Sequence, residues 1–257
     1  MIASYLEKVN QAFLVLPIFA DIRFAPDMCP KMKCNKKEWV LNGKTVFYAA
    51  FDSIRDTLDY DFGQEKAFSY AELDVAQSIK HIAKFISGIW QIHPFCEGNT
   101  RTTAVFMIKY LQTFGFNVSN QVFADNSWYF RNALVRANYN DLQNDIHATT
   151  EFLEKFIENL LTGTEHELKN RYMHIEYTES AQSAKSDVSK CQNCTLEELA
   201  LLREIAKNPT ITQKELALAM GVSERTIKRR TVELQDKDFL RRKNGKRNGQ
   251  WEVLVEI

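Results

Sequence analysis

Residues 92–106, IHPFCEGNTRTTAVF, place a base, a carboxylate and a cation within nine positions. His93 titrates near neutrality and could take a proton from an attacking hydroxyl. Glu97 could hold a magnesium ion that bridges phosphates. Arg101 carries a planar guanidinium that suits phosphate oxygens. This set predicts phosphoryl or nucleotidyl transfer, in which positioning and charge neutralisation do most of the work.

The local sequence also predicts how these side chains are held. Pro94 disfavours helical geometry at the residue before it, so a preceding helix should end near His93. The chain then crosses a loop containing Gly98 and enters a new helix at about Arg101. The amides of residues 98–101 would be the free N–H groups of a helix N-terminus, which attract anions. A Gly-Asn turn is also ordinary loop chemistry, so composition alone leaves a purely structural turn open.

Amphipathic patterns on both sides predict the helices that must position the motif. Val75, Ile79, Ile82, Ile86 and Ile89 follow steps of four and three, which is one face of a helix over residues 74–92. Residues 101–114 are apolar almost all round, as expected of a central buried helix. Residues 127–142 and 149–161 read as two further helices, the second ended by Gly163.

The segment HPFCEGNTR resembles the signature of the Fic (Fic/DOC) family, H-P-F-x-[D/E]-G-N-G-R-x-x-R. The matching positions are His93, Pro94, Phe95, Glu97, Gly98, Asn99 and Arg101. The resemblance extends over roughly residues 51–175 and implies an all-helical core. It also implies a small flap hairpin at EKAFSYA, residues 65–71, that aligns the target protein. Members of the family transfer AMP, or less often another phosphate-containing group, to a hydroxyl of a target protein.

The resemblance implies a role for each matching residue. His93 would be the general base, and Glu97 would hold Mg²⁺ on the phosphates of ATP. The nucleotide-binding residues would be Phe95 as the loop anchor, Gly98, Asn99, Thr100, Arg101 and, at the adenosine end, Asn138.

Two positions depart from the signature. Thr100 replaces its second glycine, and a side chain there is expected to crowd the phosphate loop. Ala104 replaces its last arginine, which removes a cation that would contact phosphate. In the family that arginine also pairs with an inhibitory glutamate from the pattern [S/T]-x-x-x-E-[G/N], and no clean copy of it occurs here. Glu158 is the candidate kept for that role, although Glu38, Glu154 and Glu158 also fit as ordinary surface or core carboxylates.

A second pattern, TQKELALAMGVSERTIKRRTVEL, predicts a helix-turn-helix. Thr212 and Ser223 are N-caps and Gly221 permits a left-handed turn between the two helices. Residues 223–235 would then form the recognition helix. Asn-Gly turns at residues 244–245 and 248–249, with an alternating strand after them, predict the wing of a winged helix.

The charge of this region favours DNA as its partner. Residues 223–250 contain ten basic and four acidic residues, a net charge of +6, whereas the whole chain has 33 of each. The expected DNA-binding residues are Arg225, Lys228, Arg229 and Arg230 on the helix and Lys243, Lys246 and Arg247 on the wing. A protein–protein module is the alternative, since winged helices serve both purposes.

Composition predicts the overall organisation. We expect an N-terminal segment, 1–50, packing on the core; a Fic-like catalytic core, 51–176; a polar linker, 177–193; and a winged helix-turn-helix domain, 194–257. Five cysteines, including the pair Cys191 and Cys194, are better explained as reduced cytoplasmic thiols than as a zinc site or a disulfide framework. The apolar N-terminal stretch is too short to span a bilayer, so no membrane partner is expected.

The sequence therefore predicts a mainly α, cytoplasmic protein adenylyltransferase with an α+β winged-helix domain that binds DNA. It would use Mg²⁺ and ATP and modify a Ser, Thr or Tyr hydroxyl of a target protein. Two alternatives stay open. One is a DNA-binding regulator whose core only senses a nucleotide, and the other is a phosphotransferase. A homodimer is also left open.

Overall fold

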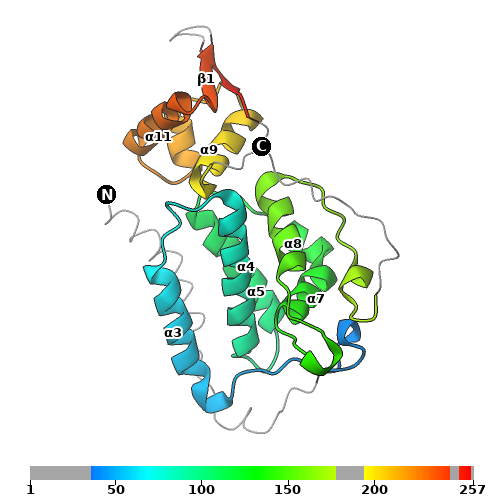
Figure 1. Ribbon diagram of the computed structural model, residues 1–257. Helices are drawn as coiled ribbons and strands as arrows, with labels where there is room; N and C mark the ends of the chain where they lie inside the picture. Colours follow the sequence, from blue (N-terminus) through cyan, green and yellow to red (C-terminus); the bar gives the residue numbers. More distant parts are fainter. Residues whose placement is uncertain (1–35, 178–193, 244–248, 256–257) are drawn as a thin grey trace.

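The computed structural model describes residues 36–177, 194–243 and 249–255. A helical core is followed by a smaller domain with three helices and two strands (Figure 1). The elements of the core are η1 (Trp39–Leu41), η2 (Phe51–Ser53), α3 (Ile54–Ala67), α4 (Val75–Ile92), α5 (Asn99–Thr113), α6 (Asn120–Asp125), α7 (Ser127–Ala137), η3 (Leu142–Asn144), α8 (Glu151–Thr162) and η4 (Asn170–Met173). Those of the second domain are α9 (Leu196–Lys207), α10 (Gln213–Ala219), α11 (Glu224–Asp236), β1 (Leu240–Lys243) and β2 (Gln250–Val253). None of the helices in these ranges has the length and apolar character needed to cross a bilayer.

Helix α4 lies at the centre of the core and contacts α3, α5, α7 and α8. Asp74 and Gln77 form a capping box that begins the helix, and its apolar face is buried as the sequence pattern predicted. Helix α5 returns beside it with Phe106, Met107 and Leu111 in the core. The buried central helix is confirmed, although it begins at Asn99, two residues earlier than expected.

Helix α7 ends earlier than its apolar pattern suggested. The side-chain Nδ2 of Asn138 donates to the Leu134 carbonyl at 2.9 Å and to the Ser87 carbonyl at 3.0 Å, which ties the end of α7 to α4. Helix α8 ends as expected at Gly163, whose φ of 74° lies in the left-handed region that favours glycine.

The flap hairpin expected at residues 65–71 is not formed. Residues 65–67 are the last turn of α3, and residues 68–71 form a turn without strand pairing. The buried carboxylate of Glu65 holds this segment, because it accepts hydrogen bonds from Tyr70 at 2.7 Å and from Tyr110 and also pairs with His81. His81 lies twelve residues before His93 on α4, so the segment sits about 18 Å from the motif along the helix axis. The family resemblance implied a hairpin here, whereas in the folded chain Tyr70 is buried and Phe68 stacks on His81.

The N-terminal residues that the structure describes pack on the core beside the motif instead. The Ile175 N–H donates to the Val40 carbonyl at 2.9 Å, and Lys44 pairs with Asp141 at 2.5 Å. Gln91 Nε2 donates to the Phe47 carbonyl at 3.1 Å, which places Phe47, in the irregular segment 44–50, against the last turn of α4. The first 35 residues of the expected segment lie outside the described residues.

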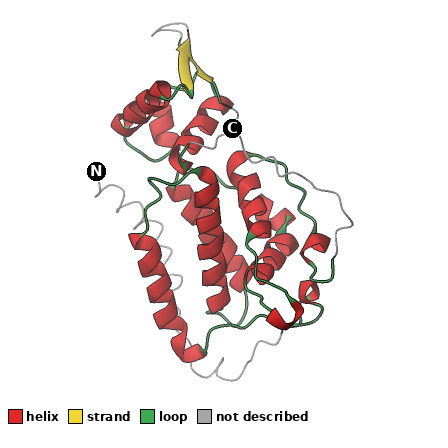
Figure 2. Ribbon diagram, in the orientation of Figure 1, coloured by secondary structure: helices red, strands yellow, loops and turns green. Residues whose placement is uncertain are grey.

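The C-terminal domain has the predicted winged helix-turn-helix architecture. Thr195 and Thr212 form capping boxes with Glu198 and Glu215, and Ser223 caps α11. Strands β1 and β2, yellow in Figure 2, pair antiparallel with Leu240 opposite Val253. The Trp251 indole donates to the Ile211 carbonyl at 3.1 Å and so ties β2 to the segment before α10.

This domain docks on the end of the core that is remote from the motif (Figure 1). Arg203 of α9 donates to the carbonyls of Leu160 and Leu161 at the end of α8, at 3.1 and 2.5 Å. Gly115, just after α5, faces Met220 and Ala200 so closely that an added Cβ would lie 2.9 Å from Met220 Cε. His93 follows the opposite end of the 18-residue helix α4, about 27 Å away along its axis.

Candidate functional site

His93 is the residue that ends α4. Its backbone is left-handed, with φ 55° and ψ 55°, and its N–H still donates to the Trp90 carbonyl at 3.2 Å. The helix end predicted from Pro94 is therefore confirmed. The imidazole lies against Tyr48, with ring centroids 4.0 Å apart, and meets Trp90 edge-on at 6.2 Å. An N-terminal segment and a core helix thus enclose the side chain from two sides.

Both ring nitrogens of His93 are buried, and neither has a hydrogen-bond partner within the described ranges. Burial, together with the positive charges of Lys36 and Arg131, lowers the pKa of His93 from 6.5 to about 4. The imidazole is therefore neutral at pH 7, which is the form that accepts a proton. An unpaired buried nitrogen costs free energy in the resting protein, so a substrate proton donor would gain a ready partner there.

The loop after His93 is held by Asn99. Asn99 Nδ2 donates to the Phe95 carbonyl at 2.6 Å, and its Oδ1 accepts from the Phe95 N–H at 3.0 Å. Gly98 lies inside the closed loop with φ 81°, a left-handed conformation that favours glycine. Both ends of the Asn99 carboxamide are thus engaged within the protein, and its role in nucleotide binding stays a prediction. Through these two bonds, Asn99 fixes the backbone of Phe95, whose side chain is half-buried.

Helix α5 starts directly behind this loop and presents the amides of its first turn, which have no acceptor within a helix. Arg101 is exposed, and its Nη2 lies 3.7 Å from where a Cβ on Gly98 would be, so the guanidinium lies over the loop. The partial positive charge of the helix N-terminus and the guanidinium together favour an anion at this position. The sequence-predicted Gly98 and Arg101 are thus brought together.

Glu97 is exposed at the mouth of the loop. Within the described residues, no group of three or more His, Cys, Asp and Glu side chains could hold a metal ion by itself. A single carboxylate beside an anion site nevertheless suits magnesium, which commonly binds one or two carboxylates together with substrate phosphates. The residues present therefore fit an ion that arrives with the nucleotide, rather than one resident in an all-protein cage.

Thr100 and Ala104 show how the two departures from the signature are accommodated. Thr100 Oγ1 accepts from the Trp90 indole at 3.0 Å and lies 3.5 Å from Arg131 Nη1. Its hydroxyl is therefore turned toward α4 and α7 and anchors the start of α5. Ala104 is 8% exposed and belongs to the hydrophobic core.

Arg131 on α7 is a residue of this site that the sequence did not single out. Its Nη2 donates to Glu38 Oε1 at 2.5 Å, and Glu38, which precedes η1, is only 3% exposed. Arg131 comes 38 residues after His93 and belongs to no recognisable pattern, so only the folded chain shows that it lies beside Thr100. Glu38 was visible in the sequence only as one of three weak candidates for an inhibitory carboxylate.

Asn138, expected at the adenosine end, uses its amide group to cap α7 and to bond to α4, as described above. Its contacts are those of a structural tie, and a role in nucleotide binding stays a prediction.

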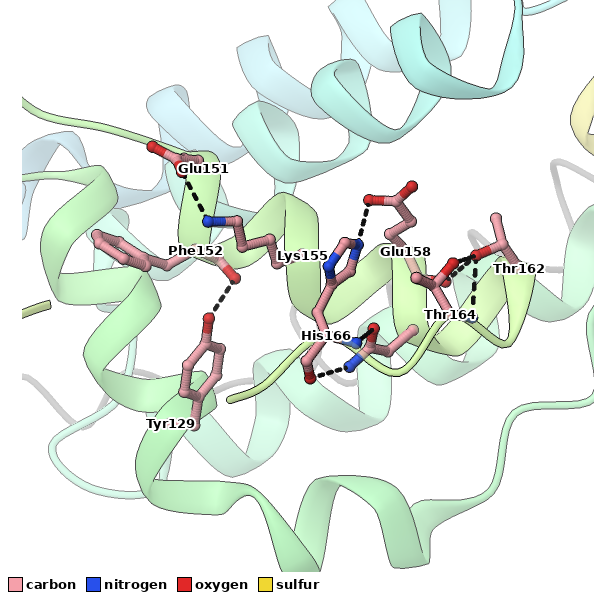
Figure 3. A network of polar contacts seen from close by, with 9 residues as sticks. Tyr129, Glu151, Phe152, Lys155, Glu158, Thr162, Thr164 and His166 are labelled. Carbon is pink, nitrogen blue, oxygen red and sulfur yellow. Dashed lines mark hydrogen bonds and ion pairs between the residues drawn. The ribbon is translucent and has the colours of Figure 1, made fainter. Parts of the chain in front are cut away.

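Glu158 lies in a different network, which Figure 3 shows together with Thr162 and Thr164. Glu158 Oε2 pairs with His166 Nε2 at 2.8 Å, while Asn159 bonds to the backbone of His166 at 2.9 and 3.0 Å. These contacts hold the loop after α8, at the end of the core to which Arg203 of α9 bonds. The Glu158 carboxylate is engaged with His166, and the inhibitory role considered for it stays a prediction.

The expected DNA-binding residues divide into two groups. Arg225, Lys228 and Arg229 are exposed on α11. Arg230 is instead mostly buried and lies 3.4 Å from Glu197 of α9, so it ties the recognition helix to its own domain. Lys243 is exposed in β1 and pairs with Glu252 across the wing. Lys246 and Arg247 lie outside the described residues, whereas Arg241 and Arg242 add exposed cations to β1.

The cysteines depart from expectation. Cys96, inside the motif, and Cys194 each take part in a disulfide bond, so the expectation of reduced thiols is wrong for these two residues. Cys29, Cys34 and Cys191 lie outside the described residues, as does almost all of the linker expected at 177–193.

Comparison with known families gives two matches along the chain. Residues 42–111 match the Fic/DOC family, and residues 198–241 match the winged helix-turn-helix DNA-binding family. The first range contains residues 44–50, His93 and the loop that Asn99 closes, and the second contains α10 and α11. Comparison with curated proteins and with solved structures gave no match.

Proposed function

We propose that this chain, a member of the Fic/DOC family with a C-terminal winged helix-turn-helix domain, is a protein adenylyltransferase. It would transfer AMP from ATP to a Ser, Thr or Tyr hydroxyl of a target protein. The observation that carries the proposal is the juxtaposition of the anion-attracting start of α5 with a neutral imidazole that has no hydrogen-bond partner among the described residues.

The residues divide the reaction between them. The triphosphate would bind over Gly98 and the first turn of α5, with Arg101 on its outer oxygens. The target oxygen attacks the α-phosphorus as His93 takes its proton, an O–P bond to AMP forms, and pyrophosphate leaves with the electrons of the broken Pα–O bond. A magnesium ion held by Glu97 and phosphate oxygens would neutralise the charge that develops on the phosphates.

The low pKa of His93 suits this sequence of events. Burial and the cations Lys36 and Arg131 keep the imidazole neutral and ready to accept a proton. The negative phosphates of a bound nucleotide would raise the pKa of His93, because an opposite charge nearby favours the protonated form. The base would therefore strengthen when its substrate is present.

The target would approach along residues 44–50. This segment forms neither helix nor strand, and Phe47 is 84% exposed next to Tyr48, whose ring lies 4.0 Å from that of His93. Such a segment could pair with a strand of the target and bring a hydroxyl to His93. These residues replace the segment at 65–71 that the sequence suggested for this purpose.

The C-terminal domain would bind DNA through α11 and the wing. Arg225, Lys228 and Arg229 are the exposed cations of α11, and an α-helix fits the major groove. A protein that binds DNA and modifies a protein target would act where DNA is accessible, in keeping with the expected cytoplasmic location.

The experiment that tests the proposal uses the full chain with Mg²⁺ and ATP labelled on either the α- or the γ-phosphate. His93→Ala serves as the control, and cell lysate supplies targets. Label transferred from the α-position and lost in the variant supports AMP transfer. Label arriving only from the γ-position would replace the proposal with phosphoryl transfer. Binding of ATP without transfer from either position would favour a nucleotide-sensing regulator.

A further inference from the structure

Arg131 reaches the start of α5 from a different helix. Its Nη1 lies 3.5 Å from Thr100 Oγ1, in the first turn of α5, and its charge acts on His93. Its side chain keeps 20% exposure, so the guanidinium is not sealed in the core. A planar cation therefore lies beside the first turn of α5, where an anion is expected.

The partner of Arg131 is a carboxylate that is poorly solvated. Glu38 is 3% exposed, and burial raises its pKa more than Arg131 and Lys36 lower it. Burial thus opposes the charged form of Glu38, and a competing anion could take its place on Arg131. A phosphate oxygen is such an anion, since it can accept two parallel hydrogen bonds from a guanidinium.

The first two turns of α5 carry a single cation, Arg101. Ala104 is part of the core, and Arg101 is exposed at the mouth. A triphosphate carries more negative charge than one guanidinium and one magnesium ion neutralise. Another cation within reach of the first turn of α5 would complete the charge balance, and Arg131 is in that position.

We propose that Arg131 is a phosphate-binding residue of the nucleotide site and that Glu38 holds it until a nucleotide phosphate takes its place. The inference rests on the proposed function, because it requires a nucleotide at the start of α5. The competing explanation is that the pair only ties residues 36–50 to the core. A structural tie alone would affect the stability of the protein and leave the affinity for nucleotide unchanged.

Three variants of the full chain separate these explanations, with the Kd for Mg-ATP measured by calorimetry. Glu38→Gln removes the competing charge and should tighten binding about tenfold, because a charge-assisted contact becomes available to phosphate. Arg131→Met should weaken binding about tenfold. In the double variant, the Glu38 substitution should have no further effect, since it acts through Arg131.

Each single variant leaves one charge of the pair without its partner, which could destabilise the fold. The double variant removes both charges and so avoids this cost. Circular dichroism and thermal unfolding check that each variant is folded. The matched control is the exposed pair of Glu151 and Lys155, which are 2.7 Å apart on α8, changed to Gln and Met. Adenosine, which has no phosphate, is the second probe, and its affinity should be the same in every variant.

The outcomes distinguish the two proposals. If the wild type binds Mg-ATP and the folded Arg131→Met and double variants bind it with the same Kd, the role of Arg131 is overturned while the proposed function stands. Failure of both the wild type and Glu38→Gln to bind any nucleotide would overturn the proposed function. Binding by Glu38→Gln that is at least about tenfold tighter than the wild type, and that is lost on adding Arg131→Met, supports the inference.

Discussion

Asn99 bonds to both backbone groups of Phe95, donating to its carbonyl at 2.6 Å and accepting from its N–H at 3.0 Å. The side chain is 5% exposed, so these bonds are shielded from water. One carboxamide therefore closes the loop that carries Glu97 and Gly98, and it fixes the direction in which the chain leaves His93.

We expect Asn99→Ala to lower the free energy of unfolding by about 1–3 kcal/mol, because two buried backbone groups lose their partners. Urea unfolding measures this change, with the exposed Asn117→Ala as the control. Binding of Mg-ATP should also weaken, since the loop no longer holds one conformation. Equal stability of the two variants would show that the loop is held by other contacts.

Gly98 and Gly63 offer a matched pair of substitutions. Gly98 has φ 81°, whereas Gly63 lies inside α3 with open space where a Cβ would be added. We expect Gly98→Ala to destabilise the protein by about 1–2 kcal/mol, because alanine is strained in the left-handed region. Gly63→Ala should stabilise it by up to about 1 kcal/mol through better helix propensity. Thermal unfolding of both variants measures the effects, and a loss in both would contradict the expectation.

The stability of the protein should depend on the protonation of His93. Its pKa is about 4 in the folded protein and 6.5 by default in an unfolded chain, so the unfolded state binds more protons between those values. The free energy of unfolding should therefore fall as pH decreases from 6.5 to 4, by about 1.4 kcal/mol per pH unit from this residue.

Urea unfolding of the wild type and of His93→Gln at pH 7, 6 and 5 isolates this contribution, because the other groups titrate in both proteins. The wild type should lose more stability than the variant at each step. Parallel pH profiles would mean that His93 keeps an ordinary pKa in the folded state.

Arg203 should matter for the attachment of the C-terminal domain. Its guanidinium bonds to the last carbonyls of α8, and burial lowers its pKa. We expect Arg203→Met to cost about 1–3 kcal/mol, since charge-assisted hydrogen bonds and a cation at a helix C-terminus are lost. Thermal unfolding checks this, with the exposed Lys207→Met of the same helix as the control. Similar unfolding temperatures for the two variants would show that apolar contacts, such as that of Gly115 with Met220, suffice.

Lys228 and Arg230 should behave differently in DNA binding. Lys228 is exposed on α11, so Lys228→Ala should weaken binding to duplex DNA and lower the slope of log K against log salt by about one. Arg230 pairs with Glu197, so Arg230→Ala should leave that slope unchanged and reduce stability instead. Fluorescence anisotropy at several salt concentrations measures both. Equal salt slopes in the wild type and Lys228→Ala would exclude Lys228 from the DNA contact.

The local elements could be predicted from the sequence because their causes are local. The capping pairs of Asp74 with Gln77 and of Thr195 with Glu198, the left-handed Gly98 and the helix end before Pro94 each depend on residues a few positions apart. The spacing of the motif was enough to predict the neighbourhood of His93, Gly98 and Arg101.

The tertiary structure alone decided which distant residues meet at the site. Arg131 and Glu38 are 93 positions apart, and Arg131 reaches both Glu38 and Thr100 only because α7 packs against η1 and α4. The flap hairpin at 65–71 was implied by the family resemblance, and Arg230 was expected to contact DNA because of its charge. In the folded chain Glu65 binds Tyr70 of the first segment, and Glu197 pairs with Arg230. Caps, turns and helix faces follow from neighbouring residues, whereas the burial and pairing of a charge depend on the packing of the whole chain.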